Sequence, residues 1–123
     1  MKNKKVLVTC PPMLGMLEEF KTISLKNYGI DLISVNVEQT LSESELIDII
    51  GDFDGWIIGD DPATKKVFER GKLGNLKAAV KWGVGTDNVD FDTARKLGIP
   101  VINTPGMFGN EVADLAFCYL ICL

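Results

Sequence analysis

The sequence predicts a doubly wound α/β fold, in which one parallel five-stranded sheet carries helices on both faces. Short β-branched runs alternate with segments of helical periodicity along the chain. The connections between them are short, which favours parallel strands joined by crossover helices. The 123 residues, 46% of them hydrophobic and 24% charged, are enough for one core of ordinary globular composition.

Five short apolar runs are the expected strands. They are residues 5–9, 30–37, 55–59, 77–82 and 99–102. The first is a β-branched run that ends before two prolines, which is typical of a buried strand leading into a rigid loop. The alternation of apolar and polar residues in 30–37 indicates a strand near the sheet edge, whereas the continuous apolar run at 55–59 indicates a central strand.

The segments between these runs have helical features. The expected helices are residues 14–28, a helix that begins after Ser42, and residues 64–70, 91–97 and 110–123. Ser42 precedes Glu45 by three positions, which is the pattern of a capping box. Strands and helices therefore alternate in the order expected of a flavodoxin-like doubly wound sheet.

The last expected helix, residues 110–123, is apolar around nearly its whole circumference after Asp114. A helix of this kind has to be covered, yet about a dozen apolar residues are too few to cross a bilayer. We therefore expect no membrane span, and a packing partner that lies beyond Leu123 or on another chain. Self-association of the isolated chain, and a homo-oligomer, are expected from the apolar side chains of Phe117, Leu120, Ile121 and Leu123.

Charge and composition exclude several classes of function. There are 13 Lys and Arg against 17 Asp and Glu, a net charge of −4, with no long basic block, so nucleic acid is not an expected partner. The cysteine count of 3 and the lack of a secretory leader predict a reducing, cytoplasmic location. The sequence contains no histidine, which excludes Ser-His-Asp, Cys-His and most zinc-dependent catalytic schemes built from this chain alone.

A glycine-rich turn, residues 83–88 (GVGTDN), follows the fourth expected strand. It resembles the dinucleotide fingerprint G-x-G-x-x-G, but Asn88 stands where the third glycine belongs, and the strand before it is the fourth and not the first. Two interpretations remain open. Gly83 and Gly85 either allow successive N–H groups to form a nest for a carboxylate or phosphate at the carboxyl end of the sheet, or they only permit a tight turn.

Acidic residues and cysteines suggest further sites that the pattern supports less well. Four aspartates could indicate a metal site or a phospho-accepting receiver domain: Asp52, Asp54, Asp60 and Asp61. A receiver also needs acidic residues after the first strand and a lysine after the fifth, and this chain has neither, so we interpret the aspartates as parts of solvated loops. Cys118 and Cys122 share a helix face without further ligands, so we interpret them as buried apolar side chains and expect no metal.

The carboxyl-terminal third of the chain carries a specific resemblance. The matching motifs are Gly83-x-Gly85-x-Asp87-Asn88-Val89-Asp90, Gly98-Ile99-Pro100-Val101, Asn103-Thr104-Pro105-Gly106 and Val112-Ala113-Asp114. In this order and spacing they resemble the end of the substrate-binding domain of the D-2-hydroxyacid dehydrogenase family, in particular its phosphoglycerate dehydrogenase-like members. Residues 1–76 fit the same pattern more loosely.

The resemblance implies a division of labour between two domains. Residues 1–108 would form the substrate-binding (catalytic) domain, and residues 109–123 would begin an interdomain helix that leads to an NAD-binding Rossmann domain outside this sequence. In the family, hydride moves between the nicotinamide of NAD and C2 of a D-2-hydroxy acid. The expected ligand is thus a small 2-hydroxy or 2-keto acid, and no catalytic residue is expected in this chain, because the Arg, Glu and His set of the family follows later.

The resemblance also assigns binding roles to individual residues. The backbone N–H groups of Val84 and Gly85, with Gly83 beside them, would hold the substrate carboxylate. Val84 would also touch the nicotinamide, and Val112 would lie near the cofactor. These roles agree with the nest interpretation of the turn. The alternative is a non-enzymatic flavodoxin-like module, either receiver-like or a stand-alone binder of small anions.

Three departures from the family pattern bear on the substrate. Lys81 stands where many members have an arginine, and a lysine cannot offer the same bidentate fork to a carboxylate or phosphate. Phe108 stands where the family has an asparagine that faces the substrate. Asp60 and Asp61 lie where some phosphoglycerate-specific members bring a cation, which argues against a phosphorylated substrate.

Overall fold

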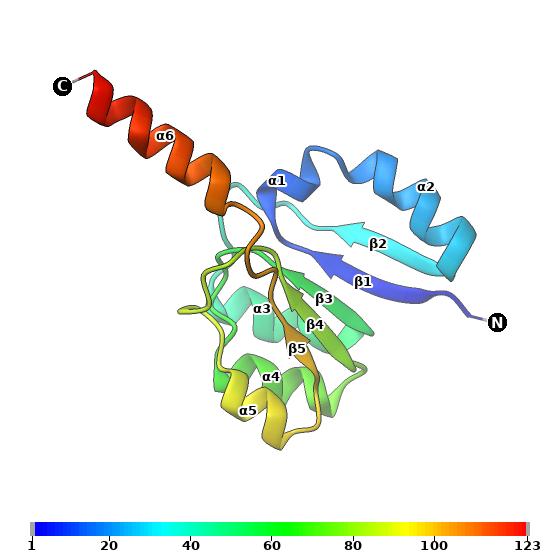
Figure 1. Cartoon of the computed structure of the whole chain (residues 1–123). Coiled ribbons are helices and arrows are strands. Elements are labelled where there is room, and N and C mark those ends of the chain that lie inside the picture. The colour runs from blue at the N-terminus through cyan, green and yellow to red at the C-terminus, as the bar shows by residue number, and fades with distance from the viewer. Residues whose placement is uncertain (1, 123) are drawn as a thin grey trace.

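The structure, a computed structural model, describes residues 2–122, which form a parallel sheet with helices on both faces (Figure 1). The five strands are β1 (Lys4–Val8), β2 (Ile30–Ser34), β3 (Gly55–Ile58), β4 (Ala78–Lys81) and β5 (Val101–Ile102). Their order across the sheet is β2-β1-β3-β4-β5, and every pair is parallel. The predicted flavodoxin-like architecture is confirmed, with β2 at an edge and β3 in the centre.

The helix bounds differ from the predicted ones at several ends, and α4 extends beyond its predicted end. They are α1 (Pro11–Leu14), α2 (Leu17–Tyr28), α3 (Glu43–Ile49), the 3-10 helix η1 (Ile50–Asp52), α4 (Lys65–Leu73), α5 (Phe91–Lys96) and α6 (Gly109–Ile121). The single helix expected at 14–28 is wrong, because the chain leaves helical geometry at Met16, with φ −116° and ψ 13°. Two prolines instead begin a separate short helix, where their missing N–H groups are not needed.

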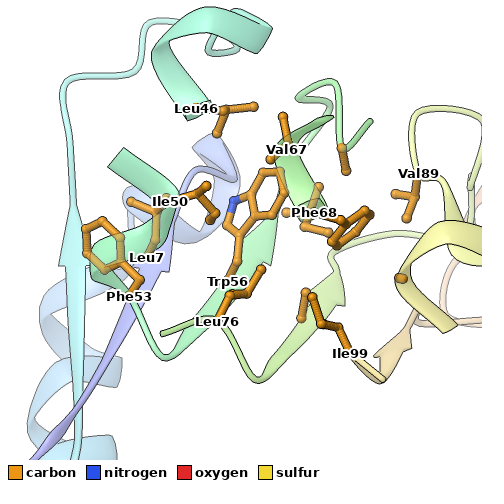
Figure 2. Close-up of a cluster of buried hydrophobic side chains, with 14 of the residues drawn as sticks. Leu7, Leu46, Ile50, Phe53, Trp56, Val67, Phe68, Leu76, Val89 and Ile99 are labelled. Carbon is orange, nitrogen blue, oxygen red and sulfur yellow. The ribbon is translucent and has the colours of Figure 1, made fainter. Parts of the chain in front are cut away.

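The larger part of the core lies between the sheet and helices α3, α4 and α5 (Figure 2). Trp56 of β3 and Phe68 of α4 are buried at its centre, with ring centroids 6.3 Å apart and planes tilted by 58°. Because side chains alternate along a strand, the other sheet face receives the next residues, and Val8 and Leu32 form a smaller cluster there with Met13 and Leu17. The two clusters hold the sheet rigid between the helix layers.

The capping box predicted before α3 is confirmed. The Ser42 hydroxyl accepts a hydrogen bond from the Glu45 N–H at 3.3 Å, and the Glu45 carboxylate accepts one from the Ser42 N–H at 2.8 Å. The hydroxyl donates to the same carboxylate, which lowers the pKa of Glu45. These reciprocal hydrogen bonds determine the residue at which α3 begins.

Helix α6 extends away from the sheet (Figure 1), and all of its residues are exposed in the described chain. The bounds agree with the predicted final helix, and Leu123 lies outside the described residues. None of the helices within residues 2–122 is long and apolar enough to cross a membrane. The interpretation of Cys118 and Cys122 as buried is wrong for this chain, because both are exposed on α6.

Candidate functional site

The loops that follow β3 and β4 enclose a cavity of about 310 Å³ at the carboxyl end of the sheet. Ligands of open parallel α/β sheets bind at this end. The cavity is lined by Asp60, Lys81, Trp82, Gly83, Gly85, Asp87 and Asn88. Three of the residues predicted to bind substrate, namely Lys81, Gly83 and Gly85, are therefore brought together here.

The glycine-rich turn leaves the sheet sharply at the end of β4. Trp82 still donates a backbone hydrogen bond to Ile58 at 2.9 Å, and the next residue, Gly83, has φ +134°, a conformation that favours glycine. Helix α5 begins only at Phe91, so the turn does not lead directly into a helix N-terminus. The fingerprint interpretation of residues 83–88 would need that direct transition.

Several backbone N–H groups of the turn, including those of Val84 and Gly85, have no partner within residues 2–122. The Gly83 N–H donates to the Thr104 hydroxyl at 3.0 Å, whereas those of Val84 and Gly85 meet no protein acceptor. A methyl group added at Gly85 would have no heavy atom within 4 Å, so the backbone there is open to a ligand. Free adjacent N–H groups at an open position favour the nest over a turn that only redirects the chain.

The loop after β3 is bonded to the end of β4 and to the loop that follows β4 by two side chains, those of Lys81 and Asn88. The Lys81 ammonium donates to the Gly59 carbonyl at 2.5 Å and to the Asp60 carboxylate at 2.9 Å. The Asn88 amide group donates to the carbonyls of Gly59 at 3.1 Å and Asp61 at 2.7 Å. Asn88, which stands in the place of the third glycine of the fingerprint, thus joins the loop after β4 to the loop after β3 by hydrogen bonds.

The cavity carries little free positive charge. The side chain of Lys81 is only 4% exposed and its ammonium already has two acceptors, whereas the Asp60 side chain is 89% exposed. Asp87 adds a second carboxylate to the lining. One cation that is already paired and two carboxylates leave the cavity wall with a net negative charge, which gives the backbone N–H groups the main role in holding an anion.

Asp61 is fully buried, so its interpretation as part of a solvated loop is wrong. Its carboxylate accepts hydrogen bonds from the Leu41 N–H at 2.8 Å, from the Gly59 N–H at 3.1 Å and from the Thr9 hydroxyl. The Trp56 indole N–H donates in turn to Thr9 at 3.0 Å. This network occupies the carboxylate from several sides, which removes Asp61 as a phospho-acceptor and makes it a support for the loop behind the cavity.

Cys10 lies at the same end of the sheet, directly after β1, and is buried. Burial raises the pKa of its thiol, with a smaller opposing effect from its hydrogen bond to the Met13 backbone. A protonated buried thiol is a poor nucleophile. Residues 2–122 also contain no group of three or more metal-binding side chains.

The remaining predicted contacts lie outside the cavity. Val84 is at its edge with 47% of its surface exposed, Phe108 is exposed just before α6, and Val112 is 64% exposed on α6. Sequence reasoning missed Asn103 and Thr104, which hold the turn from the end of β5. Their position after the fifth strand, at the same end of the sheet, was the available signal.

Comparison with known proteins agrees with this arrangement. Residues 6–118 match the family described as D-isomer specific 2-hydroxyacid dehydrogenase, catalytic domain. A D-3-phosphoglycerate dehydrogenase from Synechocystis sp. is 36% identical over 95 residues, covering 73% of this chain and 16% of the relative. A hydroxypyruvate reductase from Thermotoga maritima is 39% identical over 77 residues, covering 62% of this chain and 24% of the relative.

Among solved structures, the NAD+-bound 3-phosphoglycerate dehydrogenase of Entamoeba histolytica superimposes with a TM-score of 0.74 and 25% identity. The match covers 97% of this chain and 38% of that one, so the chain spans well under half the length of its relatives. The family match extends over most of the sequence, and the fold is that of the structural neighbours. The chain therefore belongs to the D-isomer-specific 2-hydroxyacid dehydrogenase family.

Proposed function

We propose that this chain is the substrate-binding part of an NAD-dependent oxidoreductase that acts on the CH–OH group of a D-2-hydroxy acid. The observation that carries the proposal is the pair of unpartnered N–H groups of Val84 and Gly85 beside a cavity at the carboxyl ends of the strands. Family membership supports the reaction class. A receiver-like signalling module would use Asp60 or Asp61 as phospho-acceptor, but Asp61 is buried and hydrogen-bonded, and the Asp60 carboxylate is paired with Lys81.

The chain's own residues bind and orient the acid. The two N–H groups each carry a partial positive charge, and together they can hold one carboxylate in a defined direction. The open space at Gly85 lets the carboxylate approach the backbone. With the carboxylate fixed, C2 of the acid has a fixed position, and positioning of this kind contributes to rate by orienting the reacting atoms.

NAD supplies the hydride acceptor when it is bound, and the contacts that we assign to it in this chain are apolar. Val84 and Val112 are exposed aliphatic side chains, which fit a flat nicotinamide ring and not a phosphate. Since the sequence has no histidine, we propose that the group that moves the proton at the C2 oxygen belongs to a separate cofactor domain. Residues 1–108 would be the substrate domain, and the helix that starts at 109 would lead toward the cofactor domain.

The exposed apolar residues of α6 support the same division. The helix presents large side chains to solvent on every side, including Leu115, Phe117, Leu120 and Ile121. We propose that the cofactor domain and a second copy of the protein cover this helix. The free cysteines at positions 10, 118 and 122 support a reducing, cytoplasmic setting as part of the proposal.

The test is oxidation of NADH by the holoenzyme, formed by this chain with its cofactor domain, over a panel of 2-keto acids. We expect Gly85→Ala to raise the KM for the keto acid at least about tenfold, because a methyl group would occupy the open space where the carboxylate approaches. The matched control is Gly15→Ala, where a methyl group makes only an ordinary contact of 3.6 Å and lies outside the cavity. An unchanged KM for Gly85→Ala, or turnover by the 123 residues alone, would refute the proposed role.

A further inference from the structure

The N–H groups of Val84 and Gly85 belong to peptide groups whose carbonyl oxygens are both held by one neighbouring segment. The Gly83 carbonyl accepts a hydrogen bond from the Thr104 N–H at 3.0 Å. The Val84 carbonyl accepts one from the Asn103 side-chain amide at 3.1 Å. Residues 103 and 104 directly follow β5, which pairs with β4, so the segment after one strand braces the turn after its neighbour.

Holding a carbonyl oxygen also sets the direction of an N–H group. The C=O of one residue and the N–H of the next lie in one plane and point in opposite directions across a trans peptide bond. The bond from Thr104 to the Gly83 carbonyl therefore directs the Val84 N–H away from residues 103 and 104. The bond from Asn103 to the Val84 carbonyl directs the Gly85 N–H in the same way.

The turn needs this external support because its own residues provide little. Gly83 and Gly85 have no side chains to pack, and the Val84 side chain is exposed. Rotation of the Val84–Gly85 peptide group would exchange a donor for a carbonyl oxygen, which repels a carboxylate. Asp60 and Asp87 in the cavity wall add to that repulsion, so binding depends on donors with a fixed direction.

We propose that Asn103 is a positioning residue for the acid's carboxylate, acting through the Val84 carbonyl and not through contact with the substrate. This inference rests on the proposed function of the turn. The two peptide groups differ in how they are held, since Thr104 uses its backbone on the first whereas only a side chain holds the second. Substitution of Asn103 thus releases the Gly85 N–H and leaves the Val84 N–H braced.

The experiment measures KM and kcat of the holoenzyme for a 2-keto acid in Asn103→Ala, with Asn75→Ala as the matched control. The Asn75 side-chain amide also donates to a backbone carbonyl, that of Gly51, at 3.2 Å, but it lies outside the cavity. Loss of one oriented donor should raise the KM of Asn103→Ala about tenfold and weaken competitive inhibition by oxamate, an unreactive carboxylate, by the same factor. The KM for NADH should not change, and Asn75→Ala should leave all of these constants unchanged.

Two conservative variants separate positioning from a structural role. Asn103→Asp keeps the size of the side chain but places an oxygen against the Val84 carbonyl, so its KM should rise at least as much as that of the alanine variant. Asn103→Gln keeps an amide donor and should recover most of the affinity. An active enzyme whose KM and oxamate inhibition are the same in wild type, Asn103→Ala and Asn103→Asp would overturn this inference alone. A wild type that reduces no 2-keto acid would overturn the proposed function, and the inference with it.

Discussion

Replacing the buried Asp61 by asparagine should strongly destabilise the fold. In the native network one carboxylate oxygen accepts from the Leu41 N–H, and the other accepts from both the Gly59 N–H and the Thr9 hydroxyl. An asparagine has only one acceptor oxygen, so in either orientation its NH2 group faces a backbone N–H. At least one buried donor is then left without a partner.

The size of the effect follows from these bonds. A hydrogen bond to a charged group contributes about 1.5–3 kcal/mol, and a buried donor left without a partner costs about 1–3 kcal/mol. The Thr9 hydroxyl can rotate and recover part of its bonding, so we expect a loss of about 3 kcal/mol for Asp61→Asn. In a domain of this size that corresponds to a decrease in Tm of roughly 10–15 °C.

Urea unfolding followed by tryptophan fluorescence is a suitable assay, because Trp56 donates directly to Thr9 within the network. The control is Asp92→Asn, which removes an exposed carboxylate paired with Arg95 at 3.1 Å and should change the free energy of unfolding by less than about 0.5 kcal/mol. If Asp61→Asn were as stable as Asp92→Asn, the network would not support the loop behind the cavity. That result would refute the reasoning from buried hydrogen bonds.

Two further predictions concern charge. Asp60→Asn removes a carboxylate from the cavity wall and leaves Lys81 without its counter-ion. The ratio of kcat/KM for the 3-phosphate ester of hydroxypyruvate to kcat/KM for hydroxypyruvate itself should therefore rise about tenfold. An equal ratio in Asp60→Asn and in the control Asp92→Asn would contradict this prediction. A hydrogen bond from the Lys5 N–H, with smaller effects from two lysines, lowers the pKa of Asp54 below its ordinary value. The ionised Asp54 carboxylate therefore stabilises the fold fully at pH values above the ordinary pKa. This stabilisation is lost as the pH falls through the lower pKa of the folded state. Asp54→Asn should therefore be less stable than wild type at pH 7 but equally stable in acid, and a difference that persists in acid urea titrations would show that charge is not the cause.

The strands and the capping box were predictable because each depends on residues close together in the chain. The β-branched run at 5–9 and the apolar run at 55–59 define buried strands by pattern alone, and the Ser42–Glu45 pair defines a helix start. The prediction of one helix at 14–28 was wrong because it used the same local pattern. Apolar spacing persists through Gly15, although the backbone at Met16 is not helical.

Of the candidate site, only the exposed backbone of the turn could be predicted from the sequence, and its role in binding stays a prediction. Two glycines one residue apart at the end of a strand indicate an anion nest, and that part needs no knowledge of other segments. The burial of Asp61 depends on the Leu41 N–H, twenty positions earlier in the chain, and the pairing of Lys81 depends on the end of a different strand. Contacts of this range have no signature in local pattern, so the aspartates appeared to be equivalent loop residues.

In the proposed function, a turn of small residues holds an anion at a site whose wall is negatively charged. The loop after β3 is bonded to Lys81 of β4 and to Asn88 of the turn, and the segment after β5 is bonded to Gly83 and Val84 through Thr104 and Asn103. None of these contacts occupies the N–H groups of Val84 and Gly85, which have no acceptor within residues 2–122. The segments after neighbouring strands supply the rigidity that glycines at positions 83 and 85 lack, and we propose that affinity for a carboxylate depends in this way on residues that need not touch it.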